Sequence, residues 1–135
     1  MIKIYSIIEP DKLLHVVFQS SKAMGREQLV ESSEYLQIAS LNLKSGQSFV
    51  AHKHLWKILP DNNNIAQESW VVLKGKIEVT FYDLNDVLLQ SEILGPGDVS
   101  ITLYGGHSYK IMEDSIALEF KSGPYLGKDL DKELI

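Results

Sequence analysis

Short runs of alternating apolar and polar residues, separated by turn-forming residues, are the feature that most constrains the fold of this chain. The alternation is clearest at residues 77–81, 99–103 and 116–120. Side chains that recur at every second position lie on one face of a half-buried strand. Glycine, proline, asparagine and aspartate cluster between the runs, as at 95–98, and favour turns. Strands spaced in this way from 36 to 121 predict an all-β sandwich or barrel.

The segments outside this region carry weaker patterns. Residues 2–8 predict a short additional strand on one sheet edge, whereas the charged segment 20–33 predicts a loop with at most one helical turn. The polar, turn-rich tail after Gly123 is expected to wrap over the barrel. Because no repeat or linker divides the chain, we expect a single domain over 1–135 with its barrel core at about 36–121.

Charge and composition exclude several classes of protein. The chain has 18 acidic and 13 basic residues and a net charge of −5, so it lacks the basic surface that nucleic acid requires. It has no cysteine, so a bound metal must take nitrogen and oxygen ligands. Neither a secretory signal nor an apolar segment of about 20 residues is found, so we expect a soluble cytoplasmic protein with no membrane partner.

Two histidines form the most informative local pattern. His52 and His54 are spaced by two on a predicted strand, which places both imidazoles on one face with Cα atoms about 6.6 Å apart. They can converge on one ion if a neighbouring strand supplies a further ligand. Glu68 and His107 are candidates, although a one-residue slip of the strand would turn Gln67 inward in place of Glu68. An isolated histidine such as His15 is interpreted as a surface residue.

The spacing of these residues resembles the sequence motifs of the cupin superfamily. The fixed positions of the first cupin motif are occupied by Gly46, His52, His54, Glu68 and Gly75. The turn at 96–98, followed by a strand and His107, resembles the second motif. The resemblance covers about 36–121 and implies a double-stranded β-helix, the jelly-roll barrel of cupins. It also implies one divalent metal ion (iron, manganese, zinc or nickel) bound by His52, His54, Glu68 and His107.

Aromatic residues near these positions predict a substrate pocket. Trp70 and Val72 share the strand face of Glu68, and Tyr109 shares that of His107, so these three are expected to line the cavity. Tyr109 and Tyr104 are the candidates for acid–base catalysis. The segment 55–67 is longer than the corresponding gap in cupins, and we expect it to cover the mouth of the barrel.

The resemblance leaves three functions open. The residues at 67–75 and the tail at 121–132 resemble small cupins that are often encoded among surface-polysaccharide genes, which favours a carbohydrate or nucleotide-sugar ligand. The first function is isomerase or epimerase chemistry on a small polar metabolite, with the metal as Lewis acid. The second is an Fe(II)-dependent dioxygenase, and the third is a non-catalytic binding or regulatory module. By the same resemblance a homodimer is expected, paired through the edge strand at 2–8.

Overall fold

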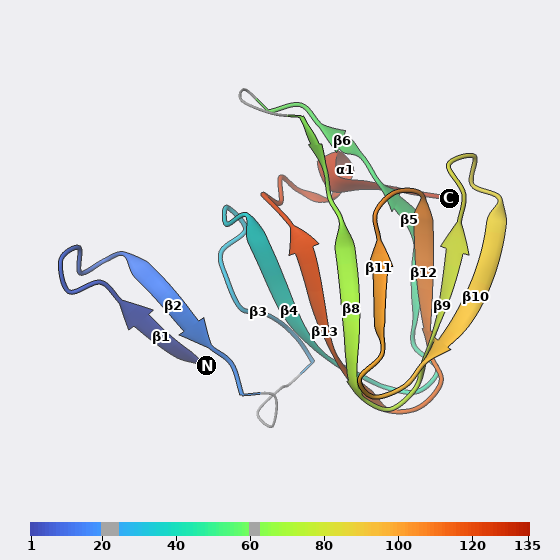
Figure 1. Ribbon diagram of the computed structural model, residues 1–135, viewed down its shortest axis with the longest axis horizontal. Coiled ribbons are helices and arrows are strands. Elements are labelled where there is room, and N and C mark those ends of the chain that lie inside the picture. Colours follow the sequence, from blue (N-terminus) through green and yellow to red (C-terminus); the bar gives the residue numbers. More distant parts are fainter. Residues whose placement is uncertain (20–24, 60–62) are drawn as a thin grey trace.

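Two five-stranded antiparallel sheets form the body of the molecule (Figure 1). The computed structural model describes residues 1–19, 25–59 and 63–135. The strands of the two sheets are β3 (Arg26–Gln28), β4 (Leu36–Leu43), β5 (Ser48–His54), β8 (Glu68–Lys74), β9 (Ile77–Tyr82), β10 (Leu88–Leu94), β11 (Val99–Thr102), β12 (Gly106–Ile111), β13 (Ser115–Ser122) and β14 (Lys132–Leu134). One sheet has the order β10-β9-β12-β5-β14 and the other β11-β8-β13-β4-β3. Strands distant in sequence are neighbours in both sheets, which confirms the predicted all-β double-stranded β-helix.

The hydrophobic core lies between the inner faces of the two sheets. Its largest fully buried apolar side chains include Leu41, Val72, Ile77, Val79 and Ile111. The turn between β8 and β9 depends on Gly75, which has φ +86° and whose Cβ, if present, would lie 2.5 Å from the Asp114 carbonyl oxygen. Glycine at this turn therefore lets β8 and β9 pass close to the start of β13.

In two strands, β13 and β11, the larger apolar side chains point away from this core. In β13, Ala117 and Glu119 are buried, and Leu118 on the outer side is only half-buried. In β11, Ser100 and Thr102 face inward while Val99 and Ile101 are exposed. The alternation in these strands therefore places small and polar side chains inside the barrel.

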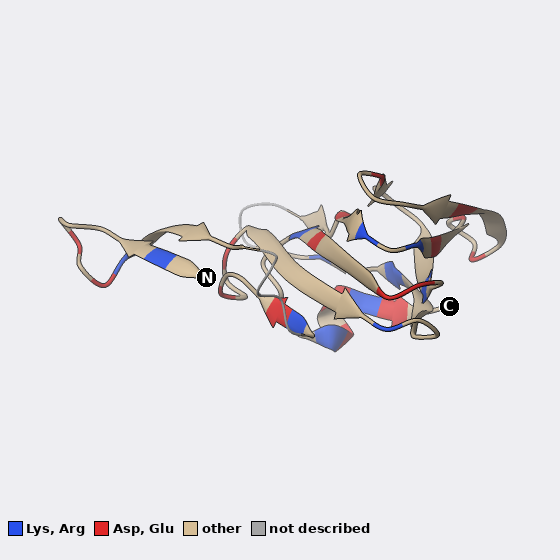
Figure 2. Cartoon of the chain, turned by 90° about the horizontal axis from the view of Figure 1, so that it is seen from below, with Lys and Arg blue, Asp and Glu red and all other residues tan. Residues whose placement is uncertain are grey.

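The N-terminal residues do not join the barrel. Strands β1 (Ile2–Tyr5) and β2 (Leu13–Val17) pair only with each other and form a hairpin that stands away from the two sheets (Figures 1 and 2). The prediction that residues 2–8 extend a barrel sheet is therefore wrong, because β1 pairs with β2 and with no strand of either barrel sheet. The predicted loop at 20–33 contains the edge strand β3, and its residues 20–24 lie outside the described residues.

The insertion and the tail both lie at the end of the barrel near the C-terminus. In the insertion, β6 (Trp56–Lys57) pairs with β7 (Asn64–Ile65), and residues 60–62 lie outside the described residues. The tail forms the short helix α1 (Lys128–Asp131) and then β14, which pairs with β5 so that Lys132 lies opposite His54. Within the described ranges no helix has the length and apolar character to cross a membrane.

Candidate metal centre

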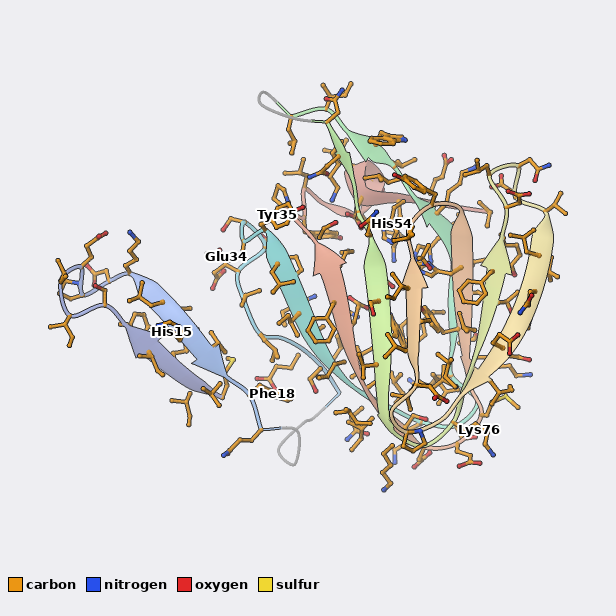
Figure 3. The ribbon with its side chains drawn as sticks, viewed as in Figure 1. His15, Phe18, Glu34, Tyr35, His54 and Lys76 are labelled. Carbon is orange, nitrogen blue, oxygen red and sulfur yellow. The ribbon has the colours of Figure 1, made fainter. Side chains whose placement is uncertain are left out.

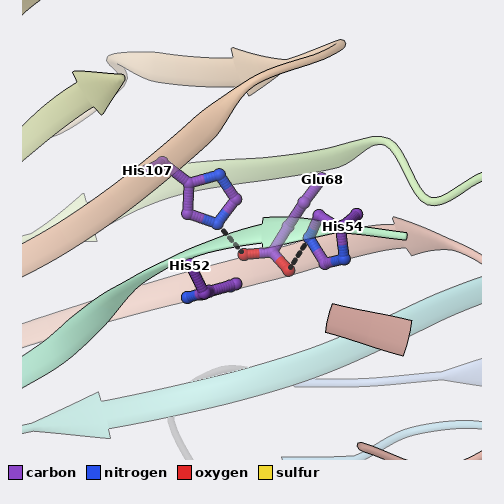
Figure 4. A group of neighbouring side chains, drawn as sticks. All are labelled: His52, His54, Glu68 and His107. Atoms are coloured by element: carbon purple, nitrogen blue, oxygen red, sulfur yellow. Dashed lines mark ion pairs between the residues drawn. The ribbon is translucent and has the colours of Figure 1, made fainter. Parts of the chain in front are cut away.

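Four side chains from three strands meet inside the barrel (Figure 4). His52 and His54 lie on β5, Glu68 is the first residue of β8, and His107 is the second residue of β12. One donor atom from each lies within 4.8 Å of the others, and no side chain of the four residues is more than about 5% exposed. All four predicted ligands are thus brought together, because β12 pairs with β5 so that His107 lies opposite His52.

The three imidazoles are oriented by hydrogen bonds at their outer nitrogens. The partners of Nδ1 are the Val50 carbonyl for His52 (2.9 Å), the Asp131 carbonyl for His54 (3.3 Å) and Thr102 Oγ1 for His107 (2.8 Å). Each Nε2 atom is buried and points inward: that of His52 has no hydrogen-bond partner among the described residues, and those of His54 and His107 face only the Glu68 carboxylate. Buried polar atoms without partners are rare, and coordination of a metal removes their cost. Three imidazole nitrogens and one carboxylate are a donor set that fits a divalent transition metal.

Glu68 lies between two of these histidines. Its Oε1 is 3.2 Å from His107 Nε2 and its Oε2 is 3.3 Å from His54 Nε2, while Trp70 Nε1 donates to Oε1 at 3.0 Å. Burial raises the pKa of Glu68, but its contacts with His107 and His54 outweigh burial and hold this pKa well below its ordinary value. The carboxylate is therefore ionised, as a metal ligand must be. Gln67 is exposed, so the register places Glu68 at the centre.

The histidines of β5 differ in their electrostatics. Burial lowers the pKa of His52 to about 4, so its imidazole is neutral at pH 7 and available as a donor. Burial also lowers the pKa of His54, but its contacts with Asp131 and Glu68 more than offset burial and raise this pKa above the usual 6.5. Metal binding must therefore displace a proton from His54 at a higher pH than from an ordinary histidine.

A buried ionic cluster holds His54 from the side away from the centre. Asp131 at the end of α1 is fully buried, and its carboxylate lies 2.8 Å from Lys57 Nζ, 2.9 Å from Lys121 Nζ and 3.4 Å from His54 Nδ1. Burial raises the pKa of Asp131, but the contacts with His54, Lys57 and Lys121 prevail and hold it below its ordinary value. Through Lys57 of the insertion and Asp131 of the tail, this cluster connects both segments to the candidate ligand His54. No local pattern distinguishes Asp131 from Asp129, so this role was not predicted.

A cavity of about 710 Å³ opens beside the four ligands. His52 and Glu68 form part of its wall, so the candidate metal centre faces the cavity. Trp70 stacks on Tyr109 with ring centroids 4.0 Å apart, and Phe49 meets Trp70 edge-on at 5.0 Å. The Tyr109 hydroxyl lies 3.0 Å from Ser100 Oγ. Burial raises the pKa of Tyr109 far above its ordinary value, so its hydroxyl stays protonated.

The other predicted site residues lie in different surroundings. Trp70 and Tyr109 line the cavity, whereas Val72 is packed in the core and is not part of the cavity wall. Tyr104 is 58% exposed and stacks on Trp56 of the insertion, away from the cavity wall. His15 lies on the hairpin, far from His54 (Figure 3).

The insertion does not contribute to the cavity wall. No described residue of 55–67 lines the cavity, whereas residues of 26–32 and of the tail at 121–132 do. Lys57 of the insertion instead donates to the Pro124 carbonyl at 2.9 Å. The insertion therefore contacts the tail, which itself lines the cavity.

Comparison with known proteins identifies the fold of this chain. No family model and no curated protein matches the sequence. Among solved structures, KdgF from Halomonas sp. is similar over 77% of this chain and 81% of its own, with 19% identity and a TM-score of 0.57. The cupin domain of Cnp3 from Schizosaccharomyces pombe is similar over 89% of this chain and 79% of its own, with 15% identity and a TM-score of 0.61. The chain has the cupin fold.

A third cupin structure is similar to nearly the whole chain. The capsular polysaccharide assembling protein CapF from Staphylococcus aureus matches 96% of this chain with 13% identity and a TM-score of 0.66. The match spans only 36% of the CapF chain, so the likeness concerns the cupin fold and not the whole of CapF.

The charges on the wall of this cupin cavity are mostly paired. Arg26 makes a bidentate contact with Glu119 at 2.9 and 2.5 Å, and Lys121 is held by Asp131. Lys132 is half-buried, lines the cavity and makes no ion pair within the described part of the chain. It lies opposite His54, so its side chain leaves the sheet on the same face as that ligand. Burial lowers the pKa of Lys132.

Proposed function

We propose that this chain is a metal-binding cupin that isomerises or epimerises a small, anionic, carbohydrate-type molecule. The observation that carries the proposal is that a buried set of three histidines and one glutamate opens, through His52 and Glu68, onto a cavity of about 710 Å³. This volume lies within the roughly 300–1,000 Å³ of small-molecule sites. A divalent metal held by His52, His54, Glu68 and His107 would supply Lewis-acid polarisation of a substrate oxygen.

The aromatic wall favours a sugar ring as the ligand. Phe49 is the half-buried aromatic residue of the cavity wall, and the stacked pair Trp70 and Tyr109, which are 1% and 2% exposed, lies directly behind it beside the metal ligands. The C–H face of a sugar ring packs well on such a surface, while its hydroxyl groups can reach the polar side chains around it. The shared fold with CapF, a capsular polysaccharide assembling protein, supports the same choice of ligand class.

The charges of the wall favour an anionic substituent. Arg26 and Lys121 are neutralised by carboxylates, which leaves Lys132 as the half-buried cation that has no ion pair among the described residues. We assign Lys132 to the binding of a carboxylate or phosphate on the substrate. Tyr109, whose hydroxyl remains protonated, is available to donate a hydrogen bond to a substrate oxygen.

The test is hydrogen exchange at carbon. The protein, loaded in turn with Mn²⁺, Fe²⁺, Zn²⁺ and Ni²⁺, is incubated in D₂O with neutral, carboxylated and phosphorylated keto- and aldo-sugars, and proton NMR follows the carbon next to the carbonyl. We expect deuterium to enter an anionic sugar and the isomer or epimer to accumulate. Lys132→Met should raise the KM for that sugar about tenfold or more, as expected for loss of a charge-assisted hydrogen bond. Lys110→Met, on the exposed outer side of β12, is the matched control.

Three results would contradict the proposal. Tight binding of a sugar without exchange or turnover would indicate a binding module. Product formation that requires and consumes O₂ would indicate a dioxygenase. Equal KM values for the Lys132→Met and Lys110→Met variants would remove Lys132 from substrate recognition.

A further inference from the structure

The wall of the cavity carries a second buried carboxylate besides that of Glu68. Glu119 on β13 is 7% exposed, lies on the inward-facing side of its strand and lines the cavity. Glu31, the third acidic residue of the described cavity wall, is exposed. Because Glu68 belongs to the candidate metal centre, Glu119 is the one buried carboxylate of this wall that is available for proton transfer. Isomerisation or epimerisation at a carbon next to a carbonyl needs such a base.

The register of the sheet places Glu119 close to the candidate metal centre. Glu119 pairs with Trp70 across β13 and β8, and Glu68 lies two residues before Trp70 on the same face of β8. Glu119 and Glu68 are therefore diagonal neighbours, and such positions are about 7–8 Å apart in an antiparallel pair. Reacting atoms approach to about 3–3.5 Å, so a substrate carbon can lie within reach of Glu119 while the adjacent oxygen faces Glu68.

Arg26 holds the Glu119 carboxylate without occupying all of its acceptor sites. The guanidinium reaches it from the edge strand β3 across β4, where the residue opposite Glu119 is the small Ala39. Its N–H groups donate to the two carboxylate oxygens at 2.9 and 2.5 Å, and none of the other hydrogen bonds in the described ranges involves Glu119. A carboxylate has about four lone-pair sites, so each oxygen keeps one that can accept a proton. Because a guanidinium is permanently charged, its bidentate partner is the carboxylate form that a base requires.

We propose that Glu119 is the base that removes a proton from the carbon next to the substrate carbonyl, an inference that rests on the proposed function. One Glu119 oxygen takes the proton, the C–H electron pair becomes the carbon–carbon double bond of an enediolate, and the carbonyl electron pair moves to its oxygen. The hydroxyl proton of the deprotonated carbon then passes to that oxygen. Return of the abstracted proton from Glu119 to the former carbonyl carbon gives the isomer, so the step needs no further reactant.

Kinetics of Glu119→Gln in the D₂O exchange assay test this role. The substitution keeps the size of the side chain and should lower kcat and the rate of deuterium entry about 100-fold or more, which is the usual contribution of a general base. The KM for the sugar and the metal content in elemental analysis should keep their wild-type values, in contrast to the raised KM expected for Lys132→Met. Glu31→Gln, which removes the exposed carboxylate of the same wall, is the matched control and should keep the wild-type kcat.

Glu119→Asp separates proton transfer from the structural role of the ion pair. It keeps the countercharge for Arg26, so the melting temperature should stay close to that of the wild type, and circular dichroism would verify the fold. It also withdraws the carboxylate by one methylene, and a displacement of about 1 Å can lower the rate about 100-fold. We therefore expect a folded protein with a kcat reduced by about that factor.

The outcomes distinguish this role from the proposed function. Exchange by the wild type that Glu119→Gln and Glu119→Asp both match in rate would overturn the role of Glu119 and leave the proposed function standing. A wild-type protein that exchanges no sugar proton would contradict the proposed function and the role of Glu119 together.

Discussion

Replacing Asp131 by asparagine tests the physical link between the tail and the candidate metal centre. Asp131 is fully buried against Lys57, Lys121 and His54, and Lys57 is itself 3% exposed. Asparagine keeps the size and the backbone carbonyl but leaves the buried ammonium groups without a countercharge. Removing one partner of a buried ion pair costs about 3–5 kcal/mol. At about 4 °C per kcal/mol for a domain of this size, we expect a melting temperature at least about 10 °C lower at pH 7.

The same substitution should weaken metal binding and should depend on pH. Loss of the carboxylate that orients His54 is expected to lower metal affinity about tenfold, measured by isothermal titration calorimetry. The pKa of Asp131 is held below that of the unfolded chain, so its stabilisation is fully present above about pH 4 and is lost as the pH falls further. The difference in stability between wild type and Asp131→Asn should therefore narrow below pH 4. Asp129→Asn, exposed on the same helical turn, is the control. If both variants had the same melting temperature and metal affinity, the reasoning would be refuted.

Three further predictions concern the site and the cavity. When the pH is lowered from 8, metal affinity should already be falling before pH 6.5 is reached, because the pKa of His54 is raised and its proton competes with the metal. Calorimetry that shows constant affinity from pH 8 to 6 would contradict this. Tyr109→Phe should lower the free energy of unfolding by about 1 kcal/mol, because it leaves the buried Ser100 hydroxyl unpaired, and should leave the metal content unchanged in elemental analysis. Arg26→Met should lower the free energy of unfolding in urea by about 2 kcal/mol, which is less than the loss of a fully buried ion pair costs because Arg26 is 42% exposed. Arg26→Lys should recover only part of this stability. Wild-type stability of Arg26→Met would contradict the role of its bond to Glu119.

The barrel and the four ligands could be predicted because their signals are local. Alternation over five residues is enough to predict a strand, and two histidines spaced by two must share a strand face. The resemblance to the cupin motifs then connected His52 and His54 with Glu68 and His107, which pairing of β12 with β5 brings within reach.

Other features depend on pairing between distant segments and left no local signal. Alternation at 116–120 predicts a half-buried strand, but it does not say which face is inside, and the structure turns Glu119 inward and Leu118 outward. The place of β14 beside β5 rests on a three-residue strand whose partner is not encoded in its own residues. That pairing positions both Asp131 and Lys132, so neither could be assigned from the sequence.

Cobalt binding tests the central claim most directly, because Co²⁺ reports its nitrogen and oxygen ligands through visible absorption. Titration of the metal-free protein should saturate at about one ion per chain, and His52→Ala and His107→Ala should abolish the spectrum while His15→Ala leaves it intact. Binding by His52→Ala that equals that of His15→Ala, in both stoichiometry and spectrum, would show that the buried imidazoles do not form a metal centre.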